Sequence, residues 1–283
     1  MLLEGPPGTG KSTLLRAVAE VAGLGFEFVE GNAELTPARL VGHFDPALVL
    51  AEGYRPEGFV DGPLVAALRA GSLLYVEELN RVPEETLNTL ITVMSEAEIH
   101  VPRLGRVVAA PGFRLVAAMN PFDAIGTARI SSAVYDRTCR VALGYQSAED
   151  ETRVVLSSSG VTGLEVEWLR RVVDLIRRTR SHGDIRVGSS VRGAIDLVMV
   201  ASALTRFRKV AGDDRMTTLD AALVALSGRI RVREGCNHTA EEIVKELWAE
   251  IFADPDSEGD GLPNDHQRAD DPGKLPAPEA ARG

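Results

Sequence analysis

Residues 1–13 of the chain read Met-Leu-Leu-Glu-Gly-Pro-Pro-Gly-Thr-Gly-Lys-Ser-Thr, and this stretch decides the fold. Gly5, Gly10, Lys11 and Ser12 have the spacing G-x-x-x-x-G-K-S. Because glycine has no Cβ, the backbone can curl until successive N–H groups point at a polyphosphate. Lys11 would add a positive charge for the β- and γ-phosphates, and the Ser12 hydroxyl is of the kind that binds Mg²⁺.

The flanking residues predict a strand before this loop and a helix after it. Met1 to Leu3 is apolar, and Leu14 to Val21 has apolar residues at helical spacing. A helix N-terminus behind the loop favours a bound anion. The alternative is a flexible Gly/Pro turn, which would not require a strand before it and a helix after it. We therefore expect the loop to bind ATP through Gly5, Pro6, Pro7, Gly8, Thr9, Gly10, Lys11, Ser12 and Thr13.

A second landmark is residues 72–81, Ser-Leu-Leu-Tyr-Val-Glu-Glu-Leu-Asn-Arg. Four apolar or aromatic residues in a row are typical of a strand buried in a parallel sheet, and here they end at Glu77 and Glu78. Since ligands of such sheets bind at the carboxyl ends of the strands, we expect both acids to face the loop. One would hold the Mg²⁺ shell and one would polarise the attacking water. The alternative is a solvated acidic pair.

Asn120 follows another apolar strand, 113–119, and its amide could orient a water or contact the γ-phosphate. Taken alone, it is better explained as a turn residue before Pro121.

The remaining pattern predicts a P-loop NTPase αβα sandwich with a mainly parallel sheet, followed by a small all-α lid domain. Strands, helices and a hairpin alternate up to about residue 145, and from residue 148 onward helical patterns stand alone. The expected helices of the second part are 149–157, 165–180, 191–210, 218–232 and 239–252. The expected domains are 1–145, with a loop or hairpin insert at 43–63 and a hairpin at 98–108, then 146–252, and a disordered acidic tail at 253–283.

Composition narrows the class of protein. The net charge is −10, and residues 254–283 hold eight carboxylates and three basic residues, so nucleic acid is not an expected partner. No apolar run is long enough for a membrane span, and no signal peptide precedes the loop. Cys139 and Cys236 lack C-x-x-C spacing, which favours a reducing cytoplasm and two small buried apolar side chains. The five histidines show no metal-ligand spacing, so ligation of a metal by histidine is not expected.

In this order and spacing, the landmarks resemble the MoxR-like branch of the AAA+ ATPases over most of residues 1–252. Residues 5–12 resemble Walker A, and residues 73–78 resemble Walker B. By the same resemblance Asn120 is the sensor 1 residue. Tyr135-Asp-Arg137 is similar to the family's L-D-R segment, which implies Arg137 as the arginine finger, with Arg129 and Arg140 as close competitors. Residues 188–193 look like the family's G-A-S-P-R-A run, which implies Arg192 as sensor 2.

The resemblance implies an ATPase that forms a ring homo-oligomer, expected to be a hexamer, with ATP and Mg²⁺ bound between subunits. It also implies a chaperone-type action on a client complex, with a von Willebrand factor A-domain protein as partner. A nucleotide-gated assembly scaffold with little turnover is the alternative function. A nucleic-acid remodeller and a small-molecule kinase fit the residues less well.

Two departures from the family pattern stand out. Glu77 takes the place of the usual Walker B aspartate, which could slow hydrolysis. The chain also begins only four residues before the loop, and we expect coding sequence upstream of Met1.

Overall fold

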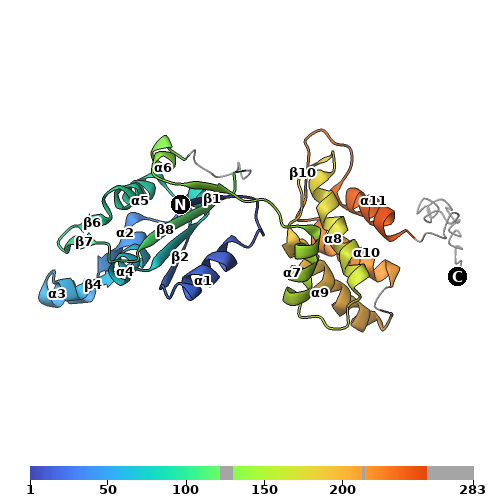
Figure 1. The fold of residues 1–283 in the computed structure, drawn as a ribbon, viewed down its shortest axis with the longest axis horizontal. Helices are drawn as coiled ribbons and strands as arrows, with labels where there is room; N and C mark the ends of the chain where they lie inside the picture. The colour runs from blue at the N-terminus through green and yellow to red at the C-terminus, as the bar shows by residue number, and fades with distance from the viewer. Residues whose placement is uncertain (122–129, 212–213, 254–283) are drawn as a thin grey trace, which may run out of the picture.

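A five-stranded parallel sheet forms the centre of the N-terminal part of the computed structural model (Figure 1). The structure describes residues 1–121, 130–211 and 214–253. The strand order is β2-β5-β8-β1-β9, and every neighbouring pair is parallel. The strands are β1 (Leu2–Glu4), β2 (Phe26–Glu30), β5 (Leu73–Glu77), β8 (Arg114–Met119) and β9 (Arg140–Ala142). The predicted α/β fold with a mainly parallel sheet is confirmed.

The pairing register aligns the carboxyl ends of the strands along one edge of the sheet. Glu30 pairs with Glu77 across β2 and β5, and Glu4 pairs with Met119 across β1 and β8. The loop after β1 therefore lies at the same edge as the acids that end β5 and the residue that follows β8.

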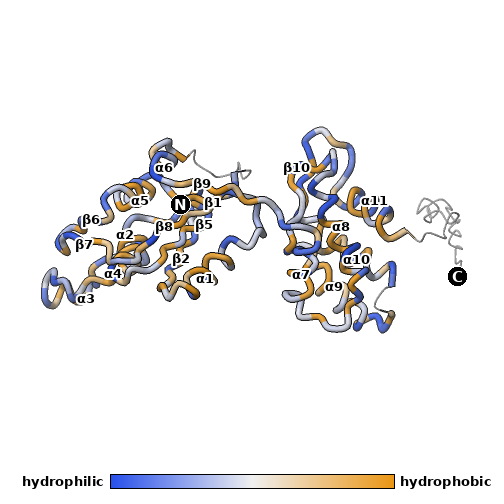
Figure 2. The backbone as a smooth tube through the Cα atoms, in the orientation of Figure 1, coloured by the Kyte–Doolittle hydropathy of each residue, from blue (hydrophilic) through white to orange (hydrophobic). Residues whose placement is uncertain are grey.

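Helices cover both faces of the sheet, which explains why its strands are apolar on both sides. On one face α1 (Lys11–Val21) buries Leu15 and Ala19 against Leu73 and Tyr75 of β5. On the other face the intervening β5 residues, Leu74 and Val76, pack in a second cluster with the helices α2 (Pro37–Val41), α4 (Pro63–Ala70) and α5 (Glu84–Glu96). Figure 2 shows the hydrophobic residues concentrated along the strands. The alternation of side chains along a strand thus divides one apolar run between two cores.

Two small antiparallel pairs project from this part of the chain. In the insert, β3 (Gly42–Phe44) pairs with β4 (Phe59–Asp61), and α3 (Pro46–Glu52) with the short 3₁₀ turn η1 (Pro56–Gly58) lies between them. Where a hairpin was predicted, β6 (Glu98–Val101) pairs with β7 (Gly105–Val108). The sequence pattern of the insert showed no helical period because α3 is only seven residues long and has no buried residue.

The C-terminal part is mainly helical and has its own core. Five helices surround a cluster that includes Leu169, Leu197 and Trp248. The helices are α7 (Ala148–Ser158), α8 (Val166–Ser181), α9 (Val191–Arg208), α10 (Arg215–Leu226) and α11 (Ala240–Phe252). None of the helices within the described ranges is long and apolar enough to cross a membrane.

The helical character of this part agrees with the prediction, but two short strands were not expected and one predicted helix boundary is wrong. The strands β10 (Ile185–Val187) and β11 (Arg231–Val232) form an antiparallel pair among the helices. The helix predicted over 218–232 ends at Leu226, because Ile230 is buried in the helical core and the next two residues pair with β10. Gly228 also weakens a helix at that position, since glycine has high backbone entropy. Long-range pairing here overrides the local periodicity.

Candidate nucleotide-binding site

The loop between β1 and α1 has the geometry of an anion cradle. Gly8 and Gly10 have φ values of 76° and 77°, in the left-handed region that favours glycine. Gly10 is the N-cap of α1, and no side chain makes a capping hydrogen bond there. The N–H groups of the first turn of α1 are therefore left for an anion, as they are at helix N-termini that bind phosphate.

Lys11 is held inside this loop. Its side chain donates hydrogen bonds from Nζ to the carbonyl oxygens of Gly5 (3.1 Å) and Pro6 (2.9 Å), and the residue is only 8% exposed. Burial lowers the pKa of Lys11, and the carboxylates of Glu77 and Glu78 oppose that shift. The hydrogen bonds of this buried ammonium to other described residues go to neutral carbonyls and a hydroxyl, and two acids lie nearby. This arrangement matches a site for a polyphosphate with a divalent cation.

Ser12 and Glu77 come together from α1 and β5. The Ser12 hydroxyl lies 3.2 Å from both carboxylate oxygens of Glu77, although 65 residues separate the two in sequence. Hydroxyl and carboxylate oxygens are the ligand types that Mg²⁺ takes at nucleotide sites, directly or through water. These two residues could hold that ion.

Glu78 lies next to this pair but has an unusual backbone. Its φ of 53° is in the left-handed region, which is strained for a residue with a long side chain. The backbone oxygen of Glu78 comes so close to Gly31 that a Cβ there would lie 2.4 Å from it. The Glu78 carboxylate forms an ion pair with Arg81 (Oε2 to Nε, 3.4 Å). The turn therefore directs two consecutive acids differently, one toward Ser12 and one toward Arg81.

Asn120 follows β8, the strand between β5 and β1. Its backbone oxygen accepts a hydrogen bond from Nδ2 of the buried Asn80 (3.4 Å). The end of β8 is thereby tied to the turn that follows Glu78, and Asn120 lies at the sheet edge that carries the loop and the acids.

Tyr75 is a residue of the site that the sequence analysis missed. It is fully buried on β5, with its ring centroid 5.8 Å from that of Phe28. Burial raises the pKa of Tyr75 to about 12, and the negative charge of Glu77 adds to the shift. The sequence could have indicated Tyr75, because alternate residues of a strand share one face. Residues 73, 75 and 77 therefore lie on the same face, and Glu77 was already a candidate.

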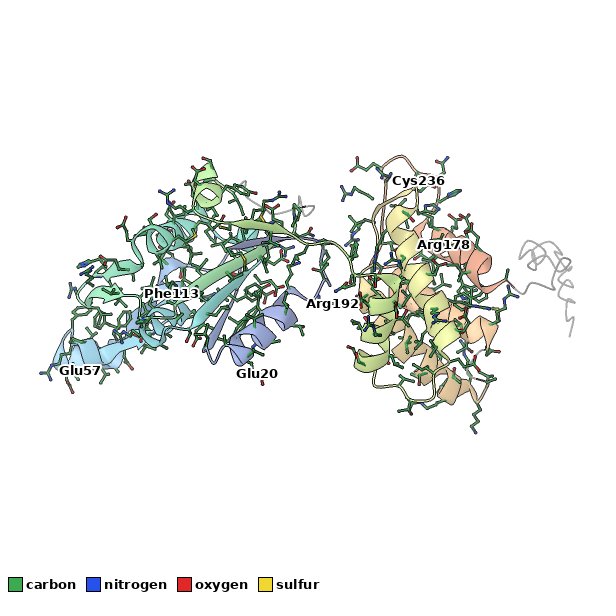
Figure 3. The ribbon with its side chains drawn as sticks, in the orientation of Figure 1. Glu20, Glu57, Phe113, Arg178, Arg192 and Cys236 are labelled. Atoms are coloured by element: carbon green, nitrogen blue, oxygen red, sulfur yellow. The ribbon has the colours of Figure 1, made fainter. Side chains whose placement is uncertain are left out.

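The helical part also reaches the loop. Gln146 donates from Nε2 to the backbone oxygen of Thr9 (3.1 Å). A Cβ added to Gly8 would lie 2.5 Å from Ser190 Oγ and 3.9 Å from Cγ of Arg192, and Figure 3 shows Arg192 at the junction of the two parts. The structure thus brings Arg192 to the loop. Gln146 has no sequence signal, because it is an ordinary polar residue just before a helix. Ser190 lies in the 188–193 run that pointed to Arg192, but nothing in that run indicates a contact with Gly8.

The three competing arginines are placed differently. Arg137 lies on the exposed end of α6 (Ser132–Asp136), where it donates to Ser95 Oγ (2.6 Å) and to the backbone oxygen of Ala133 (3.1 Å). Arg140 forms an ion pair with the buried Glu4, the residue before the loop. Arg129 lies outside the described residues.

Comparisons with known proteins agree with this geometry. Residues 1–138 match the family described as "AAA domain (dynein-related subfamily)". An uncharacterized protein of Staphylococcus aureus strain USA300 is 30% identical over 201 residues, which are 70% of this chain and 76% of that protein. One of Staphylococcus epidermidis is 28% identical over 214 residues, covering 74% of this chain and 81% of that protein.

Among solved structures, the RuvB Holliday junction branch migration motor of Thermotoga maritima has a TM-score of 0.51 at 18% identity. The match covers 79% of this chain and 60% of the RuvB chain, and at this identity it supports a shared fold and nothing about function. With the loop, the paired acids and the parallel sheet in place, the chain belongs to the AAA+ P-loop ATPases and carries the AAA domain of their dynein-related subfamily.

Proposed function

We propose that the protein is a Mg²⁺-dependent ATPase of the MoxR-like branch that uses ATP hydrolysis to remodel a protein partner. The observation that carries the proposal is the approach of the Ser12 hydroxyl to both Glu77 oxygens at 3.2 Å, beside the buried Lys11. A P-loop hydroxyl and a strand-end carboxylate facing each other form the metal half of a magnesium-nucleotide site.

The other site residues take their roles from this centre. Lys11 and the α1 N-terminus would bind the phosphates, and bound Mg²⁺ would neutralise charge that develops on them. Glu78 is the candidate base, because it is the second acid at the strand end, directly after the acid that faces Ser12. Asn120 would orient the attacking water from the end of the neighbouring strand.

Arg137 is the candidate arginine finger, acting on ATP bound to the next subunit of a ring. The charge of the partners supports this choice over Arg140. Arg140 is already paired with the buried carboxylate of Glu4 in its own chain, whereas Arg137 donates to two neutral oxygens, Ser95 Oγ and Ala133 O. For Arg192, the supporting observation is its approach to Gly8, which suits a sensor 2 residue that reports ATP from the lid.

We also propose that residues 1–145 and 146–252 are the ATPase core and the lid domain. The hydrophobic clusters of the described residues support that division: the two clusters on the sheet end at Leu143, and the cluster of the helical part begins at Val154. A hexameric ring, a von Willebrand factor A-domain partner, a client complex and a cytoplasmic location rest on the resemblance and on cysteine spacing.

The proposal is tested by measuring ATP binding and phosphate release for the wild type, Glu78→Gln and Arg137→Ala. Both variants should bind ATP normally. Glu78→Gln should lose hydrolysis, and Arg137→Ala should hydrolyse roughly 10³–10⁵-fold more slowly, the usual effect of a missing finger. Arg170→Ala, at an exposed arginine of α8, is the matched control and should behave as the wild type.

Mixing two inactive variants tests the action between subunits. Lys11→Ala has an intact Arg137 but no working loop, and Arg137→Ala has the reverse, so mixed rings should recover part of the activity. No recovery, with both variants folded and assembled, would argue against a finger in trans. A wild type that binds ATP, assembles and releases no phosphate would instead establish the nucleotide-gated scaffold.

A further inference from the structure

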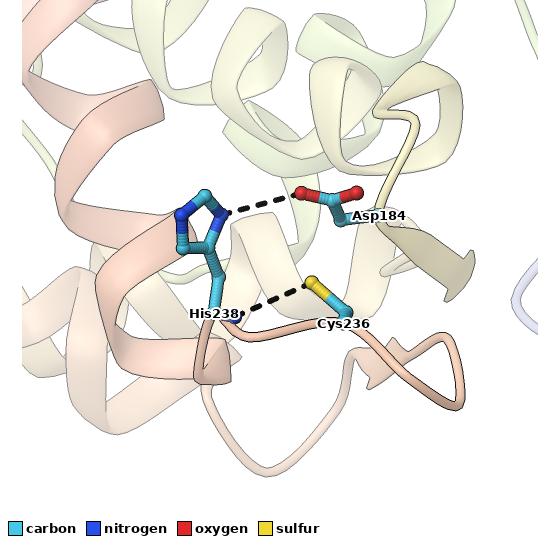
Figure 4. A group of neighbouring side chains, drawn as sticks. All are labelled: Asp184, Cys236 and His238. Atoms are coloured by element: carbon cyan, nitrogen blue, oxygen red, sulfur yellow. Dashed lines mark hydrogen bonds and ion pairs between the residues drawn. The ribbon is translucent and has the colours of Figure 1, made fainter.

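Three side chains of metal-ligating type converge in the helical part, away from the nucleotide site. They are Asp184, just before β10, and Cys236 and His238, in the segment between β11 and α11. One ligand atom of each lies within 4.8 Å of the others (Figure 4). The Asp184 and His238 side chains come from positions 54 residues apart in sequence.

Backbone hydrogen bonds hold these residues together without any ion. The β10–β11 pairing aligns Ile185 with Val232, and the next residue, Arg233, donates from its backbone N to Asp184 O (2.8 Å). Cys236 N then donates to Arg233 O (3.2 Å), which turns the thiol back toward Asp184. The three ligands are therefore pre-positioned by the fold, which lowers the entropic cost of binding an ion.

We propose that Asp184, Cys236 and His238 bind a zinc ion. Thiolate, imidazole and carboxylate are the three ligand types of protein zinc sites, and a thiolate disfavours Mg²⁺ and Ca²⁺. The site lies outside the nucleotide-binding residues and is independent of the proposed ATPase function.

The spacing fits a tetrahedral ion. His238 Nδ1 lies 3.3 Å from Asp184 Oδ2, which is about the edge of a tetrahedron with bonds of about 2.0–2.1 Å to zinc. Sulfur at about 2.3 Å from the ion would lie about 3.5 Å from each of the other two atoms. Cys236 Sγ lies within 4.8 Å of both, so a shift on the order of 1–2 Å brings it to that position. A rotation of the half-buried cysteine side chain suffices for this.

The surroundings suit a bound thiolate and leave one position open. The backbone N of His238 donates to Cys236 Sγ (3.3 Å), a hydrogen bond that a zinc-bound sulfur can also accept. Glu242, an acid in the first turn of α11, accepts hydrogen bonds from Thr239 N and Thr239 Oγ1 in a capping box. Three protein ligands and a water are therefore expected, and since His238 is exposed the ion can exchange with solvent.

A bound ion would tie the start of β10 to the start of α11. It would add a further link between these two segments, which hydrogen bonds and the contact of Asp184 with His238 already join, so zinc should stabilise the helical part.

The first test is a titration of the full chain, freed of metal with a chelator and without nucleotide, with Zn²⁺ and with Co²⁺ as its coloured substitute. One ion should bind per chain, and the Co²⁺ form should show a sulfur-to-metal absorption band. Cys236→Ser should abolish the band, and both Cys236→Ser and His238→Ala should weaken zinc binding by at least about 10–100-fold, the loss caused by removing even an outer-shell partner.

Cys139→Ser and His100→Ala are the matched controls, because they remove the same residue types on exposed parts of the sheet-containing half. Both should bind zinc as the wild type does. Zinc should also raise the unfolding midpoint of the wild type and not that of Cys236→Ser, and equal midpoints without zinc show that the variant folds. Zinc binding that is absent from the wild type, or that Cys236→Ser leaves unchanged, would overturn the proposal.

Discussion

A buried carboxylate in α7, Glu151, offers the sharpest test of how the helical part is held together. Glu151 is 1% exposed and lies between two arginines of α8. Arg177 Nη1 donates to Oε2 at 3.0 Å. Arg180 Nη2 lies 2.8 Å from Oε1, as an ion pair outside hydrogen-bond angles, and its guanidinium stacks over the Tyr145 ring at 3.8 Å.

The substitution Glu151→Ala should cost about 3 kcal/mol of the free energy of unfolding. Removing one partner of a buried ion pair typically costs about 3–5 kcal/mol, because the other charge stays buried without compensation. We expect the lower end of this range, because one of the two arginines can be hydrated after the substitution: the Arg177 side chain is 38% exposed. The Arg180 side chain is 12% exposed, so its charge is the one left largely buried. Arg180 also keeps its hydrogen bond from Nε to Ser189 O (2.7 Å).

Tryptophan fluorescence during denaturant unfolding measures this effect selectively. The two tryptophans, Trp168 and Trp248, both lie in the helical part, so their signal follows the unit that contains Glu151. The matched control is Glu167→Ala, which removes an exposed ion pair with Arg170 on α8 and should cost at most about 0.5 kcal/mol.

Equal losses in Glu151→Ala and Glu167→Ala would refute the reasoning, because they would mean that Glu151 is solvated. A double-mutant cycle with Arg180→Ala should show a coupling energy, since the double variant no longer buries an uncompensated guanidinium. The same network holds Gln146, whose backbone oxygen accepts from Arg177 (3.0 Å) and whose side chain contacts Thr9. Weaker ATP binding by Glu151→Ala is therefore also expected.

Two further predictions concern the nucleotide site. Burial raises the pKa of Tyr75 to about 12 from 10.0, so between these pH values the unfolded chain has lost a proton that the folded chain keeps. The free energy of unfolding should then fall as pH rises, by up to about 3 kcal/mol, and Tyr75→Phe should lack this part of the decline in a pH series of unfolding curves. Gly8→Ala should weaken ATP binding in a titration, because Gly8 has positive φ and a Cβ there would overlap Ser190; adding Ser190→Gly should restore part of the affinity. Gly163→Ala, at the same φ but with open space around it, is the control, and an equal effect on ATP binding there would contradict the role of the contact.

The nucleotide half of the molecule was predictable because its signals are local. The G-x-x-x-x-G-K-S spacing, the apolar run that ends at Glu77 and the helical period after the loop each specify a short segment. Parallel pairing then brings strand ends to one edge of the sheet, so the meeting of Ser12 with Glu77 follows from fold class. Asn120 lies at that edge for the same reason.

Burial of polar groups was not predictable in the same way. The first turn of α7, with Glu149, Asp150 and Glu151, has the composition of a solvated helix start, yet α8 buries one of the three acids. Its partner Arg177 is one of several arginines on α8, and its residue type does not distinguish it from the exposed ones. The cysteines were also misjudged: Cys139 is exposed and Cys236 is half-buried. Burial depends on which helices pack together, and composition does not encode that.

By itself, the sequence determined the strand, loop and helix around Lys11, the strand that presents Glu77 and Glu78, and the α/β class. These features follow from the strand period of two residues, the helix period of 3.6 residues, and the spacing of the glycines, lysine and serine in the G-x-x-x-x-G-K-S motif. Only the tertiary structure decided that β10 pairs with β11, that Ser190 and Gln146 reach the loop, and that Asp184 meets Cys236 and His238. Each of these is a contact between residues that are far apart in the sequence. Such contacts form when helices and strands pack together in three dimensions, and no local sequence pattern indicates them.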